Sequence, residues 1–542
     1  MGIALSRALH ARRLSGWLGL SLAVVLLAAA IGLAGAYAVS RTSTAVLIIL
    51  SLLLAGLFTV IILGRWYLGA IVVLVYAPFE DLFRRIIYFG HQIPHLDPVH
   101  LVQEFMLFSV VVGILLQEVV RRHEGWAALR RPSAFTLLLL FYLAYLFVQI
   151  FNPRNGDVRL GAQGFIELGY YILWFFVIQR IIHEPGQLRT LLIISLSCAV
   201  AVAGYGIFQH FHGLTPYDAF ELHRLQILIG KQSSTTFLYY GTEIRVFSTM
   251  GTYTACAAYL CINFLIAVYL LVRGSRRMRL FALGAMFVMG MCLLYTYSRT
   301  NWLGVTAGTV LLITLMRRWT PQQKIVLLGF LLLLGASLYG VMGQIGQSSV
   351  AVGNPVLQRF AQLTNGQGQA SARERVAELG YIFSFTSQNP LGAGAGANIP
   401  GGAGSVGGAK VADVHNDSYY PLLLFEVGYP GLLLFLVIAL GIVGSGLRQL
   451  ERVRTREVHA VGALMVTIVV TLLVTSLGEP YLSMGPIPTY FWLAAGVAVK
   501  LLVLDGRVLR ARAATITNRV EALPQDVVPV TRLGVGAAGG VP

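Results

Sequence analysis

Apolar runs of about 20 residues recur along the chain, and an apolar helix of that length crosses the roughly 30 Å hydrocarbon core of a bilayer. A transmembrane β-barrel would instead show short segments of alternating hydrophobicity. Of the 542 residues 56% are hydrophobic and only 12% are charged, too few charges to cover a soluble protein of this length. The sequence therefore predicts an all-α polytopic membrane protein.

The apolar runs predict about 12–14 transmembrane helices. They lie at 16–38, 44–63, 66–79, 101–119, 134–151, 165–182, 190–210, 249–272, 280–297, 300–316, 325–343, 418–443, 459–476 and 486–504. The run at 66–79 is short and ends at Pro78, so it is either re-entrant or merges with its neighbour. The first run is longer than the roughly 7–15 apolar residues of a signal peptide, which favours a retained span.

The net charge of +17 follows the pattern of membrane topology rather than that of a nucleic-acid site. Arg and Lys gather in short connectors such as RGSRRMR (273–279) and LRQLERVRTRE (447–457), and short loops govern orientation. With fourteen spans, 27 of the 40 Arg and Lys residues lie on the side of the two termini, which leaves 13 for the other side. We expect both termini in the cytoplasm, membrane lipids as partners, and no nucleic acid.

Two long segments outside the spans then fall on the opposite, external face. We expect N-terminal transmembrane helices at 1–210, an external segment at 211–248, transmembrane helices with a Ser–Arg turn at 249–343, a long external loop at 344–417, C-terminal transmembrane helices at 418–504 and a basic cytoplasmic tail at 505–542. The external loop is rich in Gly and Ser, which is typical of a flexible segment. Loops of this length are usually functional.

Two arginines lie at span ends on the external, arginine-poor side. Arg245 stands in GTEIRVFSTMGTY (241–253), and Ser298–Arg299 stands in LLYTYSRTNWLG (293–304) at a tight turn. The simpler interpretation of each is an arginine that binds lipid headgroups. Arginine at membrane depth is costly unless it is paired or liganded, however, and two guanidinium groups would suit a diphosphate.

The stretch ARERVAELGYIFSFTSQNPLGAGAGA (372–397) predicts an amphipathic helix that carries Arg373 and Arg375, followed by a glycine-rich turn. A solvated interfacial helix is the simpler alternative. The glycines do not indicate a nucleotide loop, because no β-strand precedes them.

His415 lies where the external loop re-enters the membrane, in VHNDSYYPLLLFEVGYPG (414–431), and Asn416 and Asp417 follow it. A neutral imidazole beside a carboxylate is suited to take a proton from a hydroxyl near neutral pH. The alternative is an interfacial histidine hydrogen-bonded to a neighbouring carboxylate.

Neither the cysteines nor the clustered histidines indicate a metal site or another cofactor. Pro94 interrupts HQIPH (91–95), so the helical spacing of metal ligands is missing. All four cysteines lie inside apolar runs and are typical of small buried side chains: Cys198, Cys256, Cys261 and Cys292.

Four motifs in this order resemble those of the O-antigen ligase and O-antigen polymerase superfamily of membrane glycosyltransferases. They are RVFSTMGTY (245–253), Ser298–Arg299, Arg375 with Pro390-Leu391-Gly392-x-Gly394, and HNDSYYPLLLFEVGYPG (415–431). Two features depart from the family pattern. Leu379 stands where the family has Trp, and the spacing between Asn416 and Gly428 is two residues longer.

The resemblance implies a GT-C-like fold and an inverting, metal-independent transfer of a glycan from undecaprenyl diphosphate to an acceptor hydroxyl on the periplasmic face of the inner membrane. It implies diphosphate binding by Arg245, Arg299 and Arg375, with His415 as the general base on the acceptor. Ser298, Arg373, Asn416 and Asp417 would support the site, and Tyr419, Tyr420 and Tyr481 would stack on sugars.

Two questions stay open at the level of the sequence. The acceptor is either lipid A–core, as for a ligase, or another glycan repeat unit, as for a polymerase. A transporter or flippase is the alternative function, although the sequence shows no clear internal repeat and almost no acidic residue inside the spans.

Overall fold

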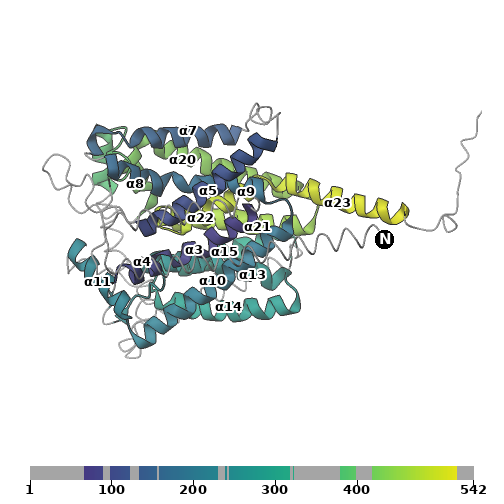
Figure 1. Ribbon diagram of the computed structural model, residues 1–542, viewed down its shortest axis with the longest axis horizontal. Coiled ribbons are helices and arrows are strands. Elements are labelled where there is room, and N and C mark those ends of the chain that lie inside the picture. The colour runs from purple at the N-terminus through teal and green to yellow at the C-terminus, as the bar shows by residue number, and fades with distance from the viewer. Residues whose placement is uncertain are drawn as a thin grey trace, which may run out of the picture.

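The structure is a computed structural model that describes residues 66–89, 98–121, 134–155, 158–229, 239–240, 243–317, 322, 379–397 and 418–521. The described elements are a bundle of helices with four 3-10 turns and a hairpin of two short strands (Figure 1). The first half contains α3 (Trp66–Tyr76), η1 (Ala77–Phe79), α4 (Glu80–Ile87), α5 (Pro98–Arg121), α7 (Ala134–Gln149), η2 (Pro153–Asn155), α8 (Val158–Leu168), η3 (Tyr170–Ile172), α9 (Leu173–Ile181), α10 (Pro185–His212) and α11 (Pro216–Ile229).

The second half begins with the antiparallel pair β1 (Tyr239–Tyr240) and β2 (Glu243–Ile244). It continues with α13 (Tyr253–Arg273), α14 (Arg276–Tyr295), α15 (Arg299–Leu315), α20 (Tyr419–Arg452), α21 (Arg456–Thr475), the 3-10 turn η5 (Tyr481–Ser483), α22 (Ile487–Ala498) and α23 (Leu501–Glu521). Residues 379–388 are also helical.

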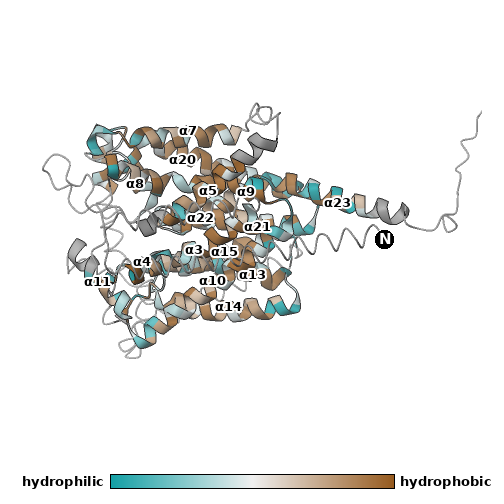
Figure 2. Ribbon diagram, in the orientation of Figure 1, coloured by the Kyte–Doolittle hydropathy of each residue, from teal (hydrophilic) through white to brown (hydrophobic). Residues whose placement is uncertain are grey.

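Seven helical segments of the described chain are long and apolar enough to cross a membrane, and α22 with α23, bent by 58°, would form an eighth. Apolar residues cover most of the bundle, and hydrophilic residues gather at its ends (Figure 2). Large apolar side chains such as Phe287, Leu440 and Phe141 are 69%, 68% and 65% exposed, as expected where lipid covers them. The prediction of an all-α polytopic membrane protein is confirmed.

Each predicted span within the described residues coincides with helix, and three, at 16–38, 44–63 and 325–343, lie outside them. The short run at 66–79 merges with its neighbour: Pro78 lies in η1, and the helical segment continues to Ile87 as one candidate span. α5 (Pro98–Arg121) covers all of the predicted span at 101–119, whereas α7 ends at Gln149, two residues before the predicted end of the span at 134–151.

The core of the bundle is formed by α13 and α21, each with 83% of its apolar window buried, against 28% for α14 and 33% for α20. α15 packs on both. A Cβ atom at Gly304 or Gly308 of α15 would lie 2.7 Å from the side chain of Thr475 or Thr471 of α21. The two glycines therefore allow the close helix approach that is common between membrane helices.

Candidate functional site

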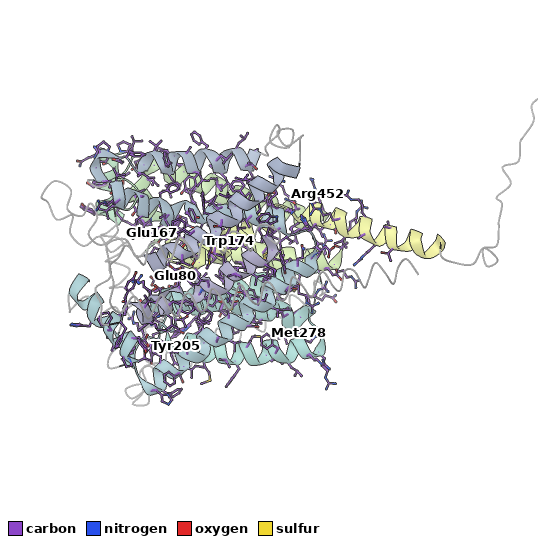
Figure 3. The ribbon with its side chains drawn as sticks, in the orientation of Figure 1. Glu80, Glu167, Trp174, Tyr205, Met278 and Arg452 are labelled. Atoms are coloured by element: carbon purple, nitrogen blue, oxygen red, sulfur yellow. The ribbon has the colours of Figure 1, made fainter. Side chains whose placement is uncertain are left out.

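The described motif residues lie at one end of the bundle, and the arginine-rich connectors lie at the other. α13 runs from Tyr253 to Arg273, and α14 returns from Arg276 to Tyr295. In Figure 3, Met278 and Arg452 lie toward the arginine-rich end, whereas Glu80, Glu167 and Tyr205 lie toward the opposite end. Arg245 precedes α13 and Arg299 follows α14, so both arginines belong to the arginine-poor end.

A backbone hydrogen bond joins the two arginine motifs. Val246 N donates to the carbonyl of Tyr295 at 3.1 Å, three residues before Ser298. The guanidinium carbon of Arg245 lies 4.7 Å from the centre of the Tyr253 ring, a cation–π contact that orients this half-buried side chain toward the start of α13. The RVFSTMGTY motif and the Ser–Arg turn therefore form one structural unit.

Arg85 of α4 anchors the strand-like segment that carries Arg245. Its Nη2 donates to the carbonyls of Ser248 and Met250, at 2.8 and 3.1 Å, and its Nη1 forms a salt bridge with Asp218 of α11. Both charged side chains are almost fully buried, 1% and 0% exposed. Gln209 Oε1 accepts from Ser248 N at 2.9 Å, and Gln209 Nε2 donates to Asp218 at 3.1 Å.

This anchor was not among the predicted site residues, although the sequence contains a signal for it. Glu80, Asp81, Arg84 and Arg85 interrupt an otherwise apolar stretch, and charge at membrane depth needs a partner. The partner could not be identified from the chain, because Asp218 follows Arg85 by 133 residues. Asp81 also belongs to the anchor, since its Oδ2 accepts from Gly251 N at 2.6 Å.

The Ser298–Arg299 turn is held by side chains that are buried behind it. Ser298 is the N-cap residue of α15, and Arg299 is the first residue of that helix and is half-buried. Asn301 Nδ2 donates to Ser298 Oγ at 2.9 Å and to the Tyr481 hydroxyl at 2.6 Å. Tyr297 adopts a left-handed backbone with φ +53°, which makes the turn tight. These contacts fix the backbone from which the Arg299 side chain extends.

Two of the three tyrosines predicted to stack on sugars are enclosed by protein. Tyr481 is 0% and Tyr419 2% exposed, so neither ring offers a face to a glycan in this structure. Tyr481 instead fixes the Ser298 turn through Asn301, and Tyr419 packs against Phe435 with ring centres 5.3 Å apart. Tyr420 is half-buried, and its hydroxyl donates to the Leu473 carbonyl at 2.7 Å.

A break in α20 makes the fourth motif structurally distinctive. Gly428 has φ +66° and ψ −170°, and Pro430 follows it inside the helix. Proline has no N–H, so the Glu426 carbonyl lacks its helical donor, and Gly394 N donates to it instead at 2.8 Å. Tyr429 N in turn donates to the Pro390 carbonyl at 3.0 Å.

The glycine-rich turn of the third motif fills that break, backbone against backbone. A Cβ atom at Gly392 would lie 2.5 Å from the Glu426 carbonyl oxygen, and one at Gly396 would lie 2.1 Å from the carbonyl oxygen of Leu160. Both glycines have φ +79°. The glycines therefore serve close packing and join the third motif to the fourth.

The remaining site predictions, Arg373, Arg375, His415, Asn416 and Asp417, lie outside the described residues. Their described neighbours do reach the same end of the bundle. Residues 379–388 are helical and lead into the glycine turn, in agreement with the predicted helix. Ser418 Oγ, at the start of α20, donates to the Ser476 carbonyl at 3.2 Å, and Gly478 lies against Thr300 of α15.

Within the described ranges no group of three or more His, Cys, Asp and Glu side chains is arranged to hold a metal ion. Cys256, Cys261 and Cys292 are buried free thiols and Cys198 is partly buried, in agreement with the predicted packing role.

Comparison with known protein families gives a match over the same region. Residues 284–436 match a family model described as O-antigen ligase, and this span contains the Ser298–Arg299 turn, the glycine-rich turn and the break in α20. No curated protein matches the chain. The family match agrees with the resemblance carried by the four motifs, and it supports a similarity of this region to the O-antigen ligase and O-antigen polymerase superfamily.

Proposed function

We propose that this chain transfers a glycan from undecaprenyl diphosphate to an acceptor hydroxyl on the periplasmic face of the inner membrane. The observation that carries the proposal is the hydrogen bond from Val246 to Tyr295, which joins the Arg245 segment to the Arg299 turn. Two guanidinium groups at one site match a diphosphate, because each can donate two parallel hydrogen bonds to its oxygens.

In the proposed reaction the acceptor hydroxyl gives its proton to His415 while its oxygen attacks the anomeric carbon. The new glycosidic bond forms as the bond between that carbon and the diphosphate oxygen breaks, which inverts the anomeric centre and releases undecaprenyl diphosphate. Arg245 and Arg299 stabilise the charge that develops on the leaving diphosphate, so that the reaction proceeds without a metal ion. An imidazole is suited to the proton transfer near neutral pH.

We assign supporting roles to the other predicted site residues. Arg375, with Arg373, would close the site over phosphate or glycan, because the helical residues 379–388 follow them in the chain and the glycine turn attaches this segment to α20 near its break. Ser298 fixes the turn through its hydrogen bond with Asn301. Asn416 and Asp417 would orient the imidazole of His415, and Tyr420 would contact the glycan.

The orientation rests on the positive-inside rule. The arginine-rich end, which includes Arg273, Arg276 and Arg452, would face the cytoplasm. The end with Arg245 and Arg299 would then face the periplasm, where a lipid-linked glycan is displayed.

Incubation of the purified chain with undecaprenyl-diphosphate-linked glycan, with and without lipid A–core, tests the function. We expect glycan transfer in at least one arm: a ladder without core identifies a polymerase, and a single shifted core band identifies a ligase. Donor that stays intact in both arms, together with movement of labelled lipid across vesicles that contain the chain, would overturn the proposal in favour of a transporter.

A further inference from the structure

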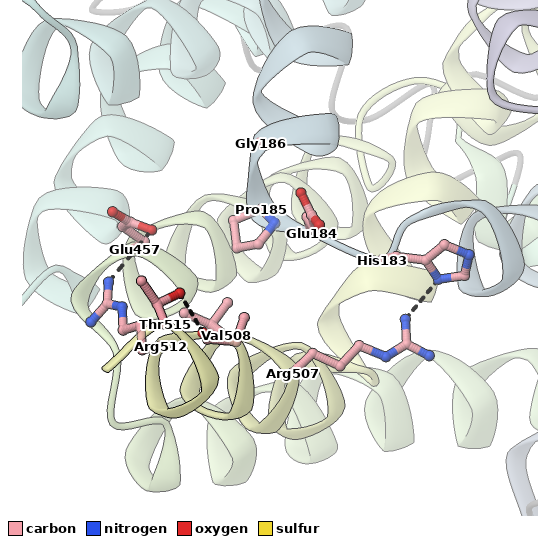
Figure 4. A pocket seen from close by; sticks show the side chains of 10 residues that line it. His183, Glu184, Pro185, Gly186, Glu457, Arg507, Val508, Arg512 and Thr515 are labelled. Atoms are coloured by element: carbon pink, nitrogen blue, oxygen red, sulfur yellow. Dashed lines mark hydrogen bonds and ion pairs between the residues drawn. The ribbon is translucent and has the colours of Figure 1, made fainter. Parts of the chain in front are cut away.

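Two adjoining cavities open at the arginine-rich end, opposite the proposed active site. Their volumes are about 810 and about 700 Å³, and they share Pro185, Gly186, Glu457 and Arg512 in their walls. Figure 4 shows the first: Glu457 and Arg512 lie on one side of the start of α10, and His183 and Arg507 lie on the other. Because the same four residues line both cavities, we treat the two as one cleft, the basic cleft.

Arginine dominates the charge of the basic cleft. Six arginines line it, against two carboxylates, which leaves a formal excess of four positive charges; they are Arg189, Arg273, Arg454, Arg456, Arg507 and Arg512. They come from α10, α13, the α20–α21 connection, α21 and α23. Elements that are distant in sequence therefore contribute arginines to the same cleft.

The two carboxylates of the basic cleft reduce its formal charge from +6 to +4 and do not neutralise it. Glu184 is the N-cap residue of α10, and its side chain accepts from the backbone of Gln187 in a capping box. Glu457 lies 3.9 Å from Arg512, with both side chains more than half exposed, and such a pair contributes little.

His183 lies beside arginine at the other side of the cleft. Its Nδ1 lies 2.7 Å from Arg507 Nη1. Burial, and then the charges of Arg507 and Lys500, lower the pKa of His183 below its usual value. The imidazole therefore adds no positive charge of its own near neutral pH, and its ring nitrogen can accept from Arg507.

Apolar side chains also line the cleft, and Leu509 among them is 38% exposed. Tyr269 and Leu270 of α13, Val461 of α21 and Leu509 of α23 line the same cavity as the arginines. An occupant that carries a phosphate group and hydrocarbon would contact both kinds of surface. A small hydrophilic anion would use the arginines alone.

We propose that the basic cleft binds a phosphate group, supplied by the headgroup of an anionic phospholipid whose acyl chains lie on the apolar side chains around Leu509. Planar guanidinium groups bind phosphate oxygens bidentately, and clustered basic side chains at a bilayer surface favour anionic lipid. This site is separate from the proposed active site, so its binding test does not depend on glycan transfer.

Native mass spectrometry of the purified full chain, with cardiolipin, phosphatidylglycerol or phosphatidylcholine added separately, measures the binding. The test variant is Arg454→Gln/Arg456→Gln/Arg512→Gln. The matched control is Arg276→Gln/Arg277→Gln/Arg448→Gln, which removes the same charge from exposed arginines outside the cavity walls. A further arm replaces lipid with pyrophosphate, to separate a lipid headgroup from a soluble phosphate.

We expect cardiolipin or phosphatidylglycerol to bind, the test variant to weaken that binding at least about tenfold, and the control to change it by less than about twofold. Pyrophosphate binding that is lost in the test variant, without lipid binding, would support the phosphate site and assign a soluble source. Equal losses in both variants, or undiminished binding in the test variant, would overturn the proposal. The single variant Arg512→Gln is not expected to affect folding, because this side chain is 57% exposed. It should weaken lipid binding several-fold with unchanged thermal unfolding. Unchanged lipid binding would count against the site.

Discussion

Substitution of Gly428 by Ala tests the contact between the glycine-rich turn and the broken helix. At φ +66° and ψ −170° any other residue is strained by about 1–3 kcal/mol. The new Cβ atom would lie 2.1 Å from the Pro390 carbonyl oxygen and 2.7 Å from Gly392 N. Because these are backbone atoms, relief of the clash requires the whole turn to move.

Movement of the turn would break hydrogen bonds that cross the contact. Ala393 and Gly394 donate to the carbonyls of Phe425 and Glu426, both at 2.8 Å, and each bond contributes about 0.5–1.5 kcal/mol. With the backbone strain, we expect Gly428→Ala to lower the free energy of unfolding by about 3–5 kcal/mol and to reduce glycan transfer.

Gly444→Ala in the same helix is the matched control. No neighbouring atom lies within 4 Å of a Cβ atom at Gly444, so alanine should raise helix stability by about 0.5–1 kcal/mol. Equilibrium unfolding in mixed detergent micelles measures both variants. If Gly428→Ala unfolds like the wild type or like Gly444→Ala, the described break and its packing against residues 390–396 are refuted.

Three further predictions concern the anchor, the diphosphate contact and the topology. Arg85→Met should lower the free energy of unfolding by about 3–5 kcal/mol, because it leaves the Asp218 carboxylate buried without its guanidinium partner. The double variant Arg85→Met/Asp218→Asn should recover part of this loss. A double variant as unstable as Arg85→Met would contradict the pairing. Arg299→Lys should lower kcat/KM for the lipid-linked donor, with a rise of about 1–3 kcal/mol in the corresponding activation free energy, since lysine cannot reproduce the planar fork of arginine. Full activity would argue against bidentate diphosphate binding. Cysteine placed at His212 should react with an impermeant thiol reagent in intact cells and cysteine at Arg277 only after permeabilisation; the reverse pattern would invert the proposed orientation.

The membrane fold and the common end of the described motifs were predictable from sequence. Apolar runs of helical length leave few alternatives, and the charged connectors divide the chain into two ends. Arg245 and Arg299 lie at the arginine-poor end in the structure for the same reason. Arg245 precedes α13, and Arg299 follows α14, which returns to the end where α13 begins.

The supports of the site were not predictable, because they join segments that are far apart in the chain. The Arg85–Asp218 pair links α4 to α11, and the partner of a buried charge is set by tertiary packing. The burial of Tyr481 has the same origin. As an aromatic residue near an external turn it was expected to stack on a glycan, but it is fully buried and its hydroxyl accepts a hydrogen bond from Asn301 of α15.

The glycine motif illustrates a third case, in which the pattern was visible and its purpose was not. Gly392 and Gly394 are typical of a tight turn, and the missing β-strand argued against a nucleotide loop. That the turn fills a break in α20 depends on Gly428 and Pro430, which lie more than thirty residues later. The local sequence of the glycine-rich turn does not predict the break in α20, and the sequence around the break does not predict the turn.

Glycan transfer by His415→Ala protein is the most direct measurement of the central claim. The substrate is undecaprenyl-diphosphate-linked glycan, and the matched control is His212→Ala, which removes a histidine from the end of α10. Loss of the general base should reduce turnover by about 10²–10⁴-fold while donor binding is retained, and the control should stay within about twofold of the wild type. Near wild-type turnover by His415→Ala would contradict the proposed mechanism.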